Sequence, residues 1–180
     1  MKNNSFSVFF RAAQDRLDIN SNKRLEYLAN QLNLLASNEN IQNKKRLELA
    51  LLMSLVKYSE EEIEVILTDK SLHVPDNEVE LVRQIYKGMS TNKEVFLPQK
   101  ENQILSDIFI LEQIGAAKLV HVFESLETSD CMQLVKEVDK ACLEAHEFFE
   151  DLQCQTSKEI AIKRLQAMDQ YRLTLKREME

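Results

Sequence analysis

Histidine is the side chain best suited to acid–base or metal chemistry near neutral pH, and the chain has three, His73, His121 and His146. Di-iron sites in helical bundles require a glutamate three residues before a histidine. The residues at that offset are instead Lys70, Lys118 and Leu143. The histidine spacing therefore predicts no di-iron site.

His146 is the strongest single candidate for acid–base chemistry, because a carboxylate follows it on the same helical face. Glu150 lies four residues further along, which is the spacing of neighbours on a helix surface. Two hypotheses fit this pair, a metal or acid–base site and an ordinary surface pair, and we favour the surface pair. We therefore assign no catalytic, cofactor-binding or metal-binding residue from the sequence, and we expect no cofactor.

The three cysteines, Cys131, Cys142 and Cys154, lie in one predicted helix. Gaps of 11 and 12 residues separate them by about 16–18 Å along a helix axis, too far for a disulfide or a shared metal ion. Cys131 lies in the first turn, where the helix dipole lowers a thiol pKa, so it is a candidate nucleophile. We favour burial of Cys131 and Cys142 in a reducing compartment, and we expect Cys154 to be exposed at the helix end.

Lys44, Lys45 and Arg46 form the one compact basic cluster of the sequence. The whole chain has a net charge of −7, which disfavours contact with phosphate backbones, so a nucleic-acid partner is not expected. We favour a solvated helix start at this cluster. The sequence contains no Walker, GxSxG, HExxH or zinc-finger pattern. An enzyme whose polar site converges from distant helices stays open as an alternative.

The glycine and proline content limits the fold class. The 180 residues include only two glycines and two prolines, against about a dozen and about nine at average usage. Tight turns, hairpins and phosphate-binding loops depend on glycine, so β-sandwiches, barrels, Rossmann sheets and P-loop folds are largely excluded. With 44% hydrophobic and 29% charged residues, the composition predicts a packed all-α protein.

The segment 98–126 is expected to form the central helix of an irregular bundle of seven or eight helices. Fourteen of the 23 residues from 104 to 126 are hydrophobic, and they surround the whole helical wheel. A helix that is apolar on most sides is buried on most sides, so we expect Leu111 to be fully buried. Gly115 is the position at which this helix is expected to bend.

A heptad pattern predicts a long helix over about 129–154, followed by a helix from about residue 156. Apolar residues recur from Cys131 to Leu152 at alternating steps of four and three. Residues 124–151 hold nine acids and two bases, whereas residues 158–177 hold six bases and two acids. The short connection predicts a C-terminal antiparallel hairpin that places Arg172 near Glu137. The 131–152 heptad face is also the surface on which a homodimer would form.

We expect a single helical domain over 1–180. The alternative is a division into an N-terminal subdomain, 1–90, and a C-terminal subdomain, 98–180, because both prolines and one glycine fall in the connecting regions. Residues 94–97 fit either a short strand or a helical turn. No segment has the composition of a membrane span or a signal peptide, so we expect a cytoplasmic protein of the producing cell, or of a host cell if it is a delivered effector.

These features favour a non-enzymatic helical module that acts by protein–protein contact, as an adaptor, a regulator or an effector-like protein. The alternative is an enzyme with a polar site between helices, and a nucleic-acid-binding regulator is a third hypothesis that depends on residues 44–46. A pocket with two or more buried ionisable groups would favour the enzyme. A contiguous exposed apolar patch without such a pocket would favour the binding module.

Overall fold

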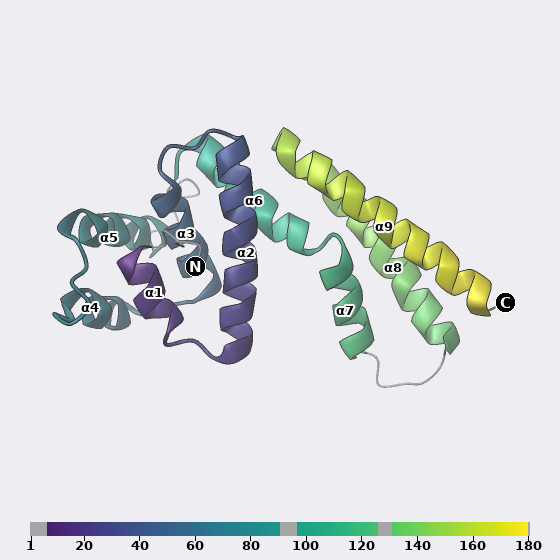
Figure 1. The fold of residues 1–180 in the computed structure, drawn as a ribbon, viewed down its shortest axis with the longest axis horizontal. Coiled ribbons are helices and arrows are strands. Elements are labelled where there is room, and N and C mark those ends of the chain that lie inside the picture. Colours follow the sequence, from purple (N-terminus) through teal and green to yellow (C-terminus); the bar gives the residue numbers. More distant parts are fainter. Residues whose placement is uncertain (1–6, 91–96, 126–130, 180) are drawn as a thin grey trace, which may run out of the picture. The chain divides into compact units, whose positions relative to one another are not determined.

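The computed structural model of the chain describes residues 7–90, 97–125 and 131–179. All regular secondary structure in these ranges is helical, which confirms the all-α class (Figure 1). The helices are α1 (Val8–Gln14), α2 (Ile19–Asn38), α3 (Lys44–Leu55), α4 (Glu60–Thr68), α5 (Asp76–Ser90), α6 (Gln99–Glu112), α7 (Ala116–Ser125), α8 (Cys131–Glu150) and α9 (Gln155–Met179). None of these helices is long and apolar enough to cross a membrane.

The chain divides into two compact units, Met1–Leu105 and Ser106–Glu180, and the division falls within α6. Each unit buries its own set of apolar side chains. The expectation of one domain, with an alternative division near residues 90–98, stays a prediction. Residues 94–96 lie outside the described ranges, so the choice between a strand and a helical turn there also stays a prediction.

The unit Met1–Leu105 is built on α2 and α3, which pack against each other, while α1 and α5 both contact α3. The apolar stripe of α2 is fully buried and consists of Leu25, Leu28, Leu32 and Leu35. At the start of α4, Ser59 Oγ accepts a hydrogen bond from the Glu62 amide, and the Glu62 carboxylate accepts one from the Ser59 amide. This reciprocal cap satisfies two amides that a helix start leaves without partners.

In the unit Ser106–Glu180, α8 and α9 form the predicted antiparallel hairpin (Figure 1). The buried seam includes Val138, Cys142 and Ala145 of α8 and Ala161, Leu165 and Met168 of α9. Helix α7 packs against both hairpin helices. Lys118 Nζ of α7 lies 3.0 Å from Glu144 Oε2 of α8, and the rings of Phe123 and Tyr171 meet edge to face at 6.0 Å.

The stretch 98–126 is two helices rather than the single helix expected, which raises the number of described helices to nine. Helix α6 ends before Gly115, whose φ of +115° is rarely adopted by residues with a side chain. Arg164 of α9 stabilises the break, because its Nη1 donates to the carbonyl oxygens of Leu111 at 2.6 Å and Ile114 at 3.4 Å. Carbonyl groups at a helix end need such external donors. Leu111 itself is buried, as predicted.

A side chain from α6 holds the turn that joins α8 to α9. Asp107 is fully buried; its Oδ1 accepts from the Gln153 amide at 2.9 Å and its Oδ2 from the Cys154 amide at 2.8 Å. These amides immediately precede α9, where they have no acceptor within the helix. The buried carboxylate thus fixes the turn from which α9 starts.

Candidate functional site

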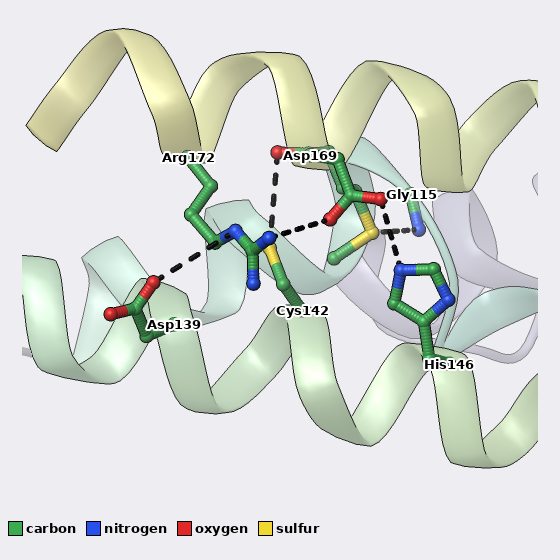
Figure 2. Close-up of polar contacts among 7 residues, drawn as sticks. Gly115, Asp139, Cys142, His146, Asp169 and Arg172 are labelled. Atoms are coloured by element: carbon green, nitrogen blue, oxygen red, sulfur yellow. Dashed lines mark hydrogen bonds and ion pairs between the residues drawn. The ribbon is translucent and has the colours of Figure 1, made fainter.

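Five ionisable side chains meet on one side of the α8–α9 hairpin, and we call them the hairpin charge cluster. Asp139 and His146 extend from α8, and Asp169 and Arg172 from α9 (Figure 2). Arg172 Nε lies 3.9 Å from Asp139 Oδ1, and its Nη2 lies 3.5 Å from Asp169 Oδ1. His146 Nε2 is 3.0 Å from Asp169 Oδ2, and Lys176 Nζ is 2.7 Å from Asp139 Oδ2. The acidic partner of Arg172 on α8 is therefore Asp139, not the predicted Glu137.

The centre of this cluster is loosely connected. Arg172 Nε and the Oδ1 atoms of Asp139 and Asp169 are shielded from solvent but have no hydrogen-bond partner among the described residues. The separations around Arg172 are ion-pair distances, longer than a hydrogen bond. Partly exposed ion pairs of this length contribute little, so the buried apolar seam rather than these charges holds the two helices together.

The contact between His146 and Asp169 resembles the pairing that orients a general base, but none of the described side chains beside it is an activated nucleophile. Cys142 lies one helical turn before His146, and its Sγ is buried 3.8 Å from the Met168 carbonyl oxygen. Burial raises the pKa of the Cys142 thiol, which disfavours the reactive thiolate. The arrangement therefore fits helix pairing better than covalent catalysis.

Two exposed leucines lie on the same side of the hairpin as the charge cluster. Leu143 is four residues after Asp139 and three before His146, which is the spacing of one helical face. Leu173 is four residues after Asp169 on α9. Leu143 is 59% exposed and Leu173 is 51% exposed.

Ile162 extends this surface along α9, because it lies two helical turns before Asp169. It is 45% exposed. Helix α7 contacts Glu144 and Tyr171, which lie on the other side of the hairpin helices. We call Leu143, Ile162 and Leu173, together with the hairpin charge cluster, the outer face. Contiguous exposed apolar surface marks an interaction site, whereas single exposed apolar side chains are normal on any protein surface.

Two of the three buried glutamates in the unit Met1–Leu105 lie on neighbouring helices, Glu48 on α3 and Glu78 on α5. Glu48 Oε1 accepts from Asn33 Nδ2 at 3.1 Å, and Glu78 Oε1 accepts from the Phe9 amide at 2.6 Å. The second oxygen of each carboxylate has no hydrogen-bond partner within the described ranges. Burial raises the pKa of Glu48, and the nearby Glu78 charge acts in the same direction.

A polar pocket of about 220 Å³ lies beside Glu78, between α3 and α5. Its lining consists of Asn43, Lys45, Asn77, Glu78, Glu80, Leu81 and Gln84. Glu78 is the buried ionisable group of this lining, and one of its oxygens already caps the start of α1. The pocket therefore does not combine the two buried ionisable groups that would favour an enzyme.

An apolar pocket of about 240 Å³ lies between the end of α3, α4 and the end of α5. Met53, Val56, Ile63 and Tyr86 supply most of its apolar walls. Nothing in the described structure indicates what would occupy it.

The three histidines do not converge. His73 is exposed, and its Nδ1 lies 3.2 Å from a backbone oxygen of its own turn. His121 is exposed and lies 3.5 Å from a glutamate of its own helix. His146 pairs with Asp169 of α9 rather than with the predicted Glu150. Across the described residues, no group of three or more histidine, cysteine and acidic side chains could hold a metal ion.

Two of the three cysteine predictions are wrong. Cys131 is exposed and Cys154 is buried, the reverse of what the heptad pattern suggested, whereas Cys142 is buried as predicted. Cys142 lies opposite Met168, so Cys131 is level with Met179, the last described residue of α9, and little of α9 remains to cover it. Cys154 is held inward because Asp107 binds its amide.

The basic cluster is largely used within the protein. Arg46 makes a two-pronged ion pair with the buried Glu101, with Nε 2.6 Å from Oε2. Lys44 Nζ donates to Ser37 Oγ at 2.7 Å. Lys45 is exposed at the rim of the polar pocket. Of the three side chains, Lys45 is exposed, whereas Lys44 and Arg46 are half-buried and paired within the unit.

The sequence reasoning missed the residues that organise both units, above all Asp107, Glu78 and Arg164. Asp107 offered a usable indication, because an acid isolated in an apolar stretch must find donors or reach solvent. No such indication existed for Glu78 and Arg164, whose partners are 69 and 53 residues away in the chain.

Comparison of the chain with protein-family models, with curated proteins and with solved structures finds no match in any of the three. The functional conclusion therefore depends on the residues of the chain itself.

Proposed function

We propose that this protein is a non-enzymatic helical module that acts by protein–protein contact, and that its outer face is where the partner binds. The observation that supports the proposal is the exposure of Leu143, Ile162 and Leu173 on one side of a packed hairpin. Each of these side chains is about half exposed although a buried seam lies directly beneath. A partner that covers them removes apolar surface from water.

The strength of such a contact follows from the area available. Complete burial of a leucine or isoleucine side chain contributes about 1.5–3 kcal/mol, so covering the half-exposed side chains contributes about 1 kcal/mol each. Three such contributions support weak, reversible binding unless flanking residues join the contact. The surrounding charges add orientation and partner choice more than affinity.

The enzyme alternative has one observation in its favour, the buried Glu78 carboxylate beside the polar pocket. Its contact with the Phe9 amide gives that carboxylate a structural role. The nucleic-acid alternative is weakened because Arg46 and Lys44 are engaged by Glu101 and Ser37. We keep the cytoplasm, of the producing cell or of a host cell, as the proposed compartment, since no disulfide joins the cysteines.

The proposal is tested by capture from a lysate of the source cells, with the tagged full-length chain and mass-spectrometric identification. The outer-face variant combines Leu143→Ser, Ile162→Ser and Leu173→Ser. The matched control removes three exposed aliphatic side chains from the other unit and combines Ile19→Ser, Leu34→Ser and Val65→Ser. We expect the outer-face variant to lose a partner that the wild type and the control retain. Equal capture by all three proteins would contradict the proposal.

A further inference from the structure

We draw no further inference here: the strongest candidate, the pair of buried carboxylates Glu48 and Glu78 beside the polar pocket between α3 and α5, carries nothing, because the oxygens that lack a partner among the described residues are shielded from solvent rather than exposed in the pocket, and nothing in the described structure shows what would occupy it.

Discussion

Removal of the Asp107 carboxylate is the sharpest test of how the hairpin unit is held together. Asp107 is fully buried in α6, and its two oxygens accept the amides of Gln153 and Cys154 in the turn before α9. Asp107→Ala removes both acceptors at once. It leaves a small cavity and two amides that the helix itself does not satisfy.

The magnitude follows from these two contacts. A hydrogen bond to a charged group contributes about 1.5–3 kcal/mol net, so two contribute about 3–6 kcal/mol. Gln153 is exposed, so water can replace the carboxylate at its amide, whereas Cys154 is buried and its amide stays without a partner. We therefore expect a loss near the lower end, about 3 kcal/mol. Asp107→Asn should lose a comparable amount, because its oxygen can accept from one amide while its NH2 group faces the other donor.

The assay is urea unfolding of the full chain followed by far-ultraviolet circular dichroism, together with hydrogen exchange at residues 153 and 154. Exchange assigns the loss to the hairpin unit, which matters because the chain has two compact units. Asp151→Ala is the matched control, since Asp151 is an exposed acid of the same turn. The control should stay within about 0.5 kcal/mol of the wild type. An equally small loss for Asp107→Ala, with unchanged exchange, would refute this reasoning.

Three further predictions concern other parts of the chain. Gly115→Ala should destabilise the chain by about 1–3 kcal/mol in urea unfolding, because φ there is +115° and the new Cβ would lie 3.1 Å from Arg164 Cδ; wild-type stability would contradict this. Burial raises the pKa of the Glu48 carboxyl group in the folded chain. The stability that protonation of Glu48 contributes is therefore fully present below the pKa of the unfolded chain, and it is lost as the pH rises through the pKa of the folded chain. Glu48→Gln should therefore raise the thermal midpoint more at pH 8 than at pH 4, and an equal effect at both would show that Glu48 does not cause the pH dependence. Alkylation of the native chain should modify Cys131 well before Cys142, as read by peptide mass spectrometry, and the reverse order would contradict the observed exposures.

The sequence predicted most of the helices and the seam of the hairpin, because periodic burial leaves a periodic pattern. The heptad positions from Val138 to Ala145 are buried against α9, as their spacing indicated. The pattern failed at its first position, Cys131, because little of α9 is left there to cover the side chain. Heptad spacing shows which positions can be buried, whereas the length of the partner helix determines which of them are.

The charged contacts were less predictable than the apolar seam. Arg172 was expected near Glu137 and lies against Asp139, two residues further along α8. The register of a hairpin depends on the turn that joins its helices, and this turn is fixed by Asp107, more than forty residues earlier in the chain. Contacts of that sequence separation are set by packing and leave no spacing that a single sequence reveals.

The division of the segment 98–126 into α6 and α7 has a similar explanation. Gly115 indicated a bend, but the full break requires Arg164 to supply donors for the carbonyl oxygens that α6 leaves unpaired. The outer face likewise could not be read from the sequence. Leu143, Ile162 and Leu173 look like ordinary apolar residues of amphipathic helices until the hairpin register shows that they share one exposed side.

The most direct test of the outer face as a protein-binding surface is site-specific photo-cross-linking inside cells that express the full chain. A benzophenone amino acid replaces Leu143 in one variant and Val65 in the other, at positions that are 59% and 56% exposed. We predict a light-dependent adduct from position 143 that position 65 does not give, with twice the mass of the chain if the occupant is a second copy. A yield at position 143 no higher than at position 65 would contradict the claim that partners bind the outer face.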